Sequence, residues 1–370
     1  MRKFLLTLMA SLVSVSAASA FWPEAADSSL DIGVGYRVDN LSWKTKADPN
    51  SSGSGSGSSY SGSSSSSYSD YSSYSEYSDY SNVATSHVKW DDLKIWQIQF
   101  GGKYVTCDNV YLKAYADYGW VTSGHNKDRD FVSNAEVTGE ELSSSRSKTK
   151  GNVYDVDLAV GYRFKLCDDS FSIVPLLGYA WKGQHLRDRD LDDSYSDPTT
   201  TVVTDPTTQV VRSKSDSSSS YSSYSSGSGE HSKYHARWDG PFVGLDFDYR
   251  FMCDWALFGS YYYQWGRYHA TGHWMLREGP EGSLPDGFRH TAKNVQGNRF
   301  DIGLAWDFCD CWTLSLEGKF EYFTAKHGRD RFNAASASEG NISVKEAISI
   351  GLKDVKWQSQ AILFNVGAVY

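Results

Sequence analysis

The chain has 370 residues, a formal net charge of −9 and 15% aromatic residues. The acidic balance argues against a nucleic-acid partner, because nucleic-acid binding domains carry clustered Lys and Arg. After the N-terminal segment, no stretch approaches the roughly 18 uninterrupted apolar residues of a spanning helix. An aromatic-rich chain of this kind fits either a secreted soluble β protein or an outer-membrane β-barrel, whose strands carry aromatic girdles.

The first twenty residues, MRKFLLTLMASLVSVSAASA, predict a secretory signal peptide. Arg2 and Lys3 form a basic start, and residues 4–15 are mostly apolar. Ala18-Ser19-Ala20 then fits a small-x-small cleavage site. We therefore expect residues 1–20 to be removed and residues 21–370 to form a single exported domain.

Ten segments alternate apolar and polar residues with a period of two, which predicts ten β-strands. In the fourth segment, Tyr154, Val156 and Leu158 fall on one face, whereas Asp155 and Asp157 fall on the other. The segments are residues 30–38, about 93–104, 110–120, 154–164, 171–182, 243–251, 255 to about 268, 300–308, 312–322 and 362–370.

The apolar faces of these segments are larger and more aromatic than the charged faces. A soluble sandwich buries apolar faces and exposes charges, whereas a membrane barrel turns apolar side chains to lipid and charges to its lumen. The pattern favours an all-β fold, a ten-stranded antiparallel transmembrane β-barrel, over a soluble sandwich. Ion pairs are expected across the lumen among Asp155, Asp157, Arg163, Asp246, Asp248, Arg250, Glu317 and Lys319.

The connections between the segments alternate in length. Short turns (TCDN, LCDD, MCDW and FCDCW) follow the even-numbered segments, and long connections follow the odd-numbered ones. Outer-membrane barrels have short periplasmic turns and longer outer loops. We therefore expect a multi-pass protein of the cell outer membrane with five long outer loops and with both termini in the periplasm.

Cysteines and histidines are separated along the expected barrel axis. The periplasm permits disulfides, but neighbouring turns lie about 10 Å apart and a disulfide needs Cα atoms within about 7 Å. Two interpretations stay open: intermolecular cross-linking to envelope neighbours, or a small residue in a repeated Cys-Asp turn. The short turns hold Cys107, Cys167, Cys253, Cys309 and Cys311, and the long connections or their mouths hold His87, His125, His185, His231, His235, His269, His273, His290 and His327.

Two Ser/Tyr-rich segments lie in long connections, at residues 51–81 and 216–229. Ser/Gly-rich sequence buries too little apolar surface to fold, which predicts flexible tethers. The regularly spaced tyrosines suggest adhesion, for example to a host surface. Neutral repeat expansion in permissive outer loops is the alternative.

Several short motifs follow one another in a fixed order between about residues 88 and 327. They are Val88-Lys89-Trp90-Asp91-Asp92-Leu93-Lys94, Gly119-Trp120 followed by Asp128-Arg129-Asp130-Phe131, Tyr154-Asp155-Val156-Asp157-Leu158-Ala159-Val160-Gly161, Pro241-Phe242-Val243-Gly244-Leu245, and Trp265-Gly266-Arg267-Tyr268-His269 followed by His273. This order resembles the omptins, a family of ten-stranded outer-membrane endoproteases.

The resemblance implies an active site in which a water lies between an aspartate pair, Asp128 and Asp130, and the histidine His273. The strands that lead to these residues are four apart in a ring of ten, so their tops nearly face each other. Close carboxylates raise the apparent pKa of the pair, and a facing histidine could take a proton from the water.

The match departs from the omptin pattern at the histidine. Thr271 stands where the family has the acid that orients the imidazole, and this segment is one residue shorter. Ala270 stands near a second family acid. The lipopolysaccharide-binding pattern keeps Gly178 and Tyr179 and loses its acid and arginine.

The resemblance implies a surface endopeptidase acting on peptides or proteins. It implies no metal or organic cofactor, and it suggests that lipopolysaccharide is needed for activity besides outer-membrane lipid. Thr271 motivates the alternative, a catalytically inactive barrel that serves as an adhesin or structural surface protein. A small porin is the third hypothesis.

Overall fold

The computed structural model describes residues 28–46, 83–132, 141–167, 170–195, 230–274, 287–309, 311–338 and 341–369. The predicted signal peptide and both Ser/Tyr-rich segments lie outside these residues. In the part of the chain that is described, no helix is long and apolar enough to cross a membrane.

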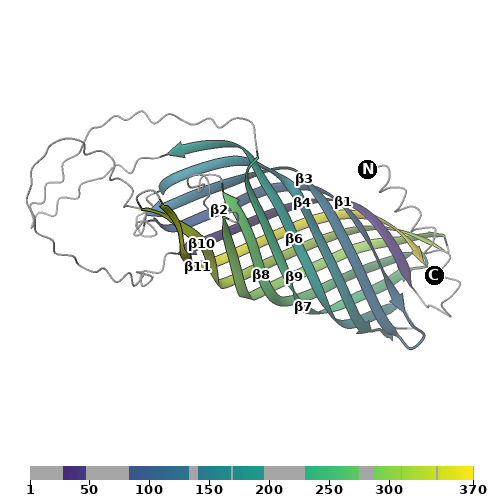
Figure 1. Cartoon of the computed structure of the whole chain (residues 1–370). Coiled ribbons are helices and arrows are strands. Elements are labelled where there is room, and N and C mark those ends of the chain that lie inside the picture. Colours follow the sequence, from purple (N-terminus) through teal and green to yellow (C-terminus); the bar gives the residue numbers. More distant parts are fainter. Residues whose placement is uncertain are drawn as a thin grey trace, which may run out of the picture.

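The described residues form eleven strands, which Figure 1 shows side by side around one barrel. The break between β4 and β5 falls at Arg163, and both strands pair with β6, so together they count as one of ten barrel strands. The strands are β1 (Ser29–Lys46), β2 (Val83–Val105), β3 (Val110–Val132), β4 (Glu141–Tyr162), β5 (Phe164–Leu166), β6 (Phe171–Tyr195), β7 (Glu230–Met252), β8 (Trp255–Trp274), β9 (Phe288–Cys309), β10 (Trp312–Ser338) and β11 (Asn341–Val369).

Each strand pairs antiparallel with the next along the chain, and the last pairs with the first. β1 and β11 run together from Ser29 opposite Val369 to Lys46 opposite Gly351. This pairing closes the barrel, so all strands between them have two neighbours. The predicted ten-stranded antiparallel barrel is therefore confirmed.

The half of the barrel nearer the short turns, here called the lower half, has an apolar outer face. Tyr36, Trp96 and Phe300 are among the large side chains exposed there. Its inner face carries ion pairs, in which carboxylates of the predicted set bind two cations outside that set. Arg37 lies 2.6 Å from Asp155, and Lys113 lies 2.8 Å from Asp246. Apolar outside and charged inside is the arrangement that a barrel adopts in lipid.

The other half, here called the upper half, has the opposite polarity. Its inner face carries large apolar side chains that are almost completely buried, including Trp43, Trp90, Trp238, Phe323 and Trp357. Its outer face is polar. The strands are therefore longer than the sequence predicted, because the prediction followed an apolar outer face and that face ends where lipid ends.

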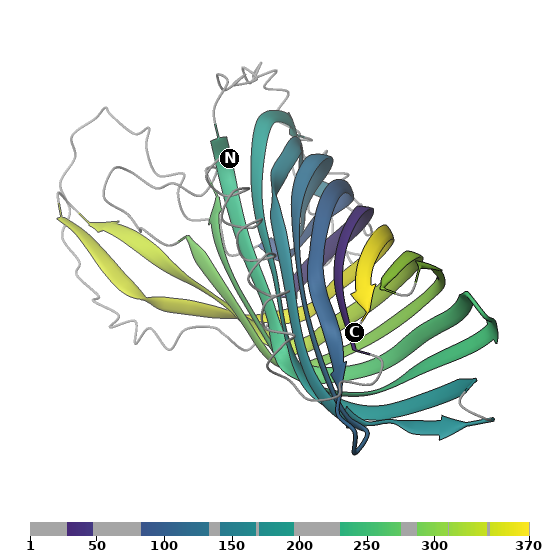
Figure 2. The ribbon, with the colours of Figure 1, turned by 90° about the vertical axis from the view of Figure 1, so that its right-hand side faces the viewer.

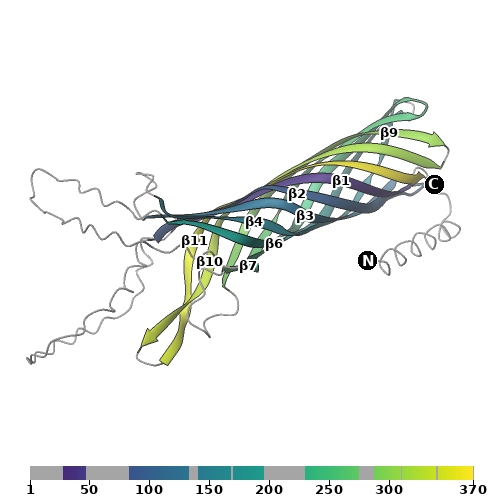
Figure 3. The ribbon, with the colours of Figure 1, turned by 90° about the horizontal axis from the view of Figure 1, so that it is seen from above.

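β10 and β11 extend furthest of all the strands, with 27 and 29 residues. β9 reaches β10 only as far as Phe332, whereas β10 and β11 stay paired up to Ser338 opposite Asn341. Figures 2 and 3 show this hairpin projecting away from the barrel as a two-stranded ribbon.

Candidate site at the outer mouth of the barrel

Asp128 and Asp130 lie in the upper half of β3, which continues to Val132 and not only to residue 120, where the predicted strand ended. β3 continues because it keeps hydrogen-bonded partners on both sides, β2 and β4. Asp128 pairs in register with Val88, and Asp130 pairs with Ser86. Both partners are buried inside the barrel, and paired residues share a face of the sheet. The two carboxylates therefore share the inner face of the mouth.

His273 lies on β8, and the alternation of that strand places its side chain on the outer face. Gly272, one residue before it, faces the interior, where an added Cβ would meet the ring of Phe288. His273 itself pairs with Lys233, which is exposed. The structure therefore does not bring His273 onto the inner face with Asp128 and Asp130. Since one residue of register flips every side chain of a strand, the shorter segment noted in the sequence is a sufficient cause.

A different histidine occupies the inner face. His290 of β9 lies opposite Asp330 of β10, with His290 Nε2 3.5 Å from Asp330 Oδ1. Its Nδ1 atom lies 3.0 Å from the hydroxyl of Tyr234, which shares a short hydrogen bond with the hydroxyl of Tyr268. Burial keeps the pKa of Tyr234 well above its usual value, so its proton stays in this chain of contacts.

The His290 side chain has no access to water at the mouth. It is 0% exposed, and Asp330 is 1% exposed. Trp43 packs edge-on against the imidazole with ring centroids 4.7 Å apart, and Phe288 covers it from another side at 4.9 Å. A general base must reach the proton that it removes, so His290 in this arrangement acts as part of the packed interior.

Asp188 of β6 is the carboxylate buried below the aspartate pair. It accepts hydrogen bonds from the indole of Trp90 at 3.2 Å, the amide of Asn126 at 2.6 Å and the hydroxyl of Thr149 at 2.6 Å. Asn126 stands two residues before Asp128 on the same face of β3. Burial raises the pKa of Asp188 to about 6, although the three donors partly oppose this rise.

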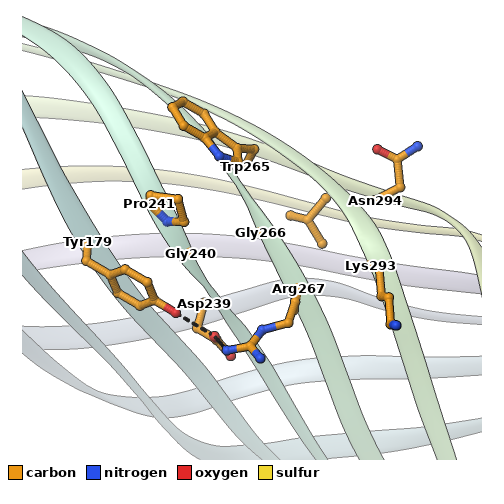
Figure 4. A pocket seen from close by; sticks show the side chains of 10 residues that line it. Tyr179, Asp239, Gly240, Pro241, Trp265, Gly266, Arg267, Lys293 and Asn294 are labelled. Carbon is orange, nitrogen blue, oxygen red and sulfur yellow. Dashed lines mark hydrogen bonds and ion pairs between the residues drawn. The ribbon is translucent and has the colours of Figure 1, made fainter.

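A second polar site lies on the outer wall, where the apolar band of the lower half ends. Figure 4 shows Tyr179 and Arg267 converging on Asp239. The tyrosine hydroxyl donates to Asp239 at 2.9 Å, and the guanidinium of Arg267 donates to it at 3.0 Å. Burial alone would raise the pKa of Asp239, but these hydrogen bonds and nearby arginine charges hold it below its usual value.

This outer-wall pocket has a volume of about 430 Å³. Trp265 and Pro241 contribute apolar surface, and Lys293 adds a second cation beside Arg267. A cationic rim next to aromatic and apolar side chains suits the boundary between lipid tails and anionic headgroups, because arginine binds phosphate strongly.

Comparison with known proteins decides the family. The model of the family described as "Pom: Protochlamydia outer membrane protein" matches residues 31–370. The chain belongs to the Protochlamydia outer membrane protein family. The match begins at the third residue of β1 and covers every later described strand, and it agrees with the barrel fold and the outer-membrane location. No curated protein matches the sequence.

Among solved structures, this family member is similar to the outer membrane protease OmpT from Escherichia coli. The identity is 13%, the TM-score is 0.59, and the match covers 94% of this chain and 99% of OmpT. The translocator domain of the autotransporter NalP from Neisseria meningitidis is more distant, with 10% identity, a TM-score of 0.31, and coverage of 99% and 96%. At 13% identity, the likeness to OmpT establishes a shared ten-stranded fold and nothing finer.

Sequence reasoning did not select His290, Asp330, Asp188 or Asp239 as site residues of this Protochlamydia outer membrane protein family member. The sequence did contain one signal for the first of them: Phe288, His290 and Ala292 alternate with the polar residues Arg289 and Thr291, and the structure buries the first set more than the second. Recognising that this face points inward requires knowing that the polarity of the wall inverts in the upper half.

Proposed function

We propose that this protein is a closed structural barrel of the outer membrane, which holds its long outer segments at the cell surface without conducting solutes or cleaving peptides. The observation that carries this proposal is the filled lumen. Both halves of the interior are occupied by side chains, although with different chemistry in each half.

The lower half is crossed by buried ion pairs. Lys182 bonds Glu321 at 2.7 Å, and Arg299 bonds Asp301 at 2.8 Å and also Asp157. The upper half holds the buried aromatic layer. The cavity between these layers, lined by Lys182, Arg299 and Phe323, has a volume of about 10 Å³, about the space that one water molecule needs. Such an interior favours a closed scaffold over a pore.

The positions of the histidines argue against peptide hydrolysis. An omptin-like mechanism needs Asp128, Asp130 and a histidine around one water, and His273 lies on the other face of the wall. His290 faces inward but is sealed under Trp43 and Phe288. The strands that flank both Ser/Tyr-rich segments, β1 with β2 and β6 with β7, end together at the upper rim, which suits a display role.

The experiment combines conductance and cleavage on one preparation of refolded protein with lipopolysaccharide. We expect no steady conductance in planar bilayers and no cleavage of a peptide library. As a positive control for conductance, Trp43→Ala, Trp238→Ala and Trp357→Ala together remove much of the aromatic layer and should produce current fluctuations. Steady wild-type conductance would support a channel instead. Cleavage that is lost in Asp128→Ala and His273→Ala would establish the endopeptidase.

A further inference from the structure

We propose that the rim at the short-turn end of the barrel joins neighbouring copies of this chain through intermolecular disulfides. The rim thiols are those of Cys167, Cys253, Cys309 and Cys311, which are free and exposed. Cys107 is exposed in the remaining turn, but the proposal rests on the other four. This inference goes beyond the proposed scaffold function and does not depend on it.

The rim thiols lie in three different hairpin turns: Cys167 between β5 and β6, Cys253 between β7 and β8, and Cys309 and Cys311 at the ends of the turn between β9 and β10. Successive turns are two strand spacings apart, about 10 Å, which exceeds the roughly 7 Å between Cα atoms that a disulfide tolerates. Only Asp310 separates Cys309 from Cys311, and a bridge that closes so small a ring would be strained.

Backbone hydrogen bonds fix the position of each turn against the neighbouring strand. The amide of Arg250 donates to the carbonyl of Ser170 at 2.8 Å, and the amide of Asp307 donates to the carbonyl of Asp254 at 2.8 Å. Each turn is thereby tied to the end of the next strand around the ring. The amide of Val369 similarly donates to the carbonyl of Cys311 at 2.9 Å. The turns therefore keep the spacing of the strands that carry them, which is wider than a disulfide within one copy tolerates.

Turn geometry does not explain why a cysteine stands at position 167. Its φ is 54°, in the left-handed region that glycine and asparagine adopt more easily than residues with an ordinary side chain. Ser170 stabilises this turn by donating both its amide and its hydroxyl hydrogen to the Cys167 carbonyl. Neither contact uses the thiol, which leaves its sulfur available for other chemistry.

A second copy of the chain is a partner that carries its own rim thiols at the same depth in the membrane. All copies in one membrane have the same orientation, so their short-turn rims lie at the same depth. Because the rim thiols lie in three different turns around the ring, one copy can bond more than two neighbours. The expected product is a branched, two-dimensional network.

The short-turn end of an outer-membrane barrel faces the periplasm, where disulfides form and persist. A rim thiolate attacks a donor disulfide, forms a mixed disulfide and releases one donor thiolate. A rim thiolate of the second copy then attacks the rim sulfur of this mixed disulfide. The inter-copy disulfide forms, the second donor thiolate leaves, and the donor disulfide has been reduced to two thiols.

The test uses the full chain at high density in vesicles of phospholipid and lipopolysaccharide, treated with oxidised glutathione and run on non-reducing gels. Wild type should give a ladder beyond the dimer that reductant collapses to monomer. Variants that keep only chosen cysteines, with serine at all the remaining ones, set the number of links. The variant that keeps only Cys253 should give dimers and no larger species. The variant that keeps only Cys167 and Cys253 should give unbranched chains. A variant with serine at all five positions should stay monomeric at equal insertion.

Two results would overturn the proposal. One is a wild type that stays monomeric, or that becomes a faster-migrating monomer with an internal disulfide, under conditions in which the barrel inserts normally. The other is labelling of the rim by a membrane-impermeant maleimide on intact cells, because the rim would then face outward. Labelling only after the outer membrane is permeabilised supports it.

Discussion

Lys182 and Glu321 meet inside the barrel, with Lys182 Nζ 2.7 Å from Glu321 Oε1 and both side chains almost completely buried. Breaking a buried ion pair from one side leaves the other charge uncompensated. We expect Lys182→Met to lower the free energy of unfolding by about 3–5 kcal/mol. Arg299 lies 3.7 Å from the same carboxylate and partly compensates its charge. The loss should therefore lie at the lower end of this range. Urea unfolding of wild type and variant in lipid vesicles measures this loss in the free energy of unfolding.

The double variant Lys182→Met/Glu321→Gln serves as the control for charge, and it should recover most of the lost stability because no unpaired carboxylate remains. Lys148→Met provides a surface control, since Lys148 and Asp190 form an exposed pair at 3.2 Å. Exposed pairs contribute no more than about 1 kcal/mol. Equal losses in Lys148→Met and Lys182→Met would contradict the argument from burial.

Asp188 should make stability depend on pH in an unusual direction for an aspartate. Its pKa is raised from 3.8 to about 6, so the folded state binds a proton more tightly than the unfolded state does. Stability from this group is present below about pH 4 and is lost as the pH rises to about 6. Two pH units at about 1.4 kcal/mol each amount to ~3 kcal/mol.

Asp188→Asn isolates this effect, because asparagine keeps an acceptor for Trp90 and Thr149 without a charge. We expect the variant to be more stable than wild type at pH 8 and to lose that advantage by pH 4. Unfolding curves at several pH values provide the comparison. A constant difference between the two proteins across this range would mean that Asp188 does not titrate there.

His185 and His235 should give the opposite pH dependence. They pair across β6 and β7, with ring centroids 4.6 Å apart. Burial and the charge of Arg187 lower the pKa of both histidines. Their contribution is complete above about pH 6.5 and is lost as the pH falls and the imidazoles gain protons. His185→Gln should reduce the loss of melting temperature between pH 7 and pH 5, whereas the same change at the more distant His125 should not.

The outer-wall pocket predicts a response to anionic lipid. If the phosphates of lipopolysaccharide bind Arg267 and Lys293, lipopolysaccharide should raise the melting temperature of the wild type. Arg267→Gln combined with Lys293→Gln should remove most of this gain. Lys94→Gln, an exposed cation on β2 away from the pocket, is the matched control. An unchanged response in the double variant would assign headgroup binding elsewhere on the wall.

The sequence was sufficient to predict the number of strands and, for most of them, the face that meets lipid. Tyr36 and Trp96 follow the alternation that a lipid-facing strand requires, and the structure confirms their exposure. The upper half was missed for a physical reason. Trp43 and Trp90 belong to the inner face, so a search for apolar outer faces ends before it reaches them.

The candidate site was less predictable, because it depends on register. Asp128 and Asp130 share a face in any regular strand, which is a local property. Whether His273 joins them depends on the parity of β8 relative to β3, and a single residue in the connecting segment reverses it. His290 and Asp330 are 40 positions apart, and only the pairing of β9 with β10 places them opposite each other.

Because the polarity of the wall inverts halfway along the barrel, the two halves are stabilised by different solvents during assembly. Water alone favours burial of the tryptophans of the upper half, as it does in a soluble protein. The lower half becomes favourable only when lipid replaces water on its outer face. A chain arriving from the periplasm can therefore gather its aromatic layer while still in water. The bilayer then receives a partly organised cylinder and not an extended polypeptide.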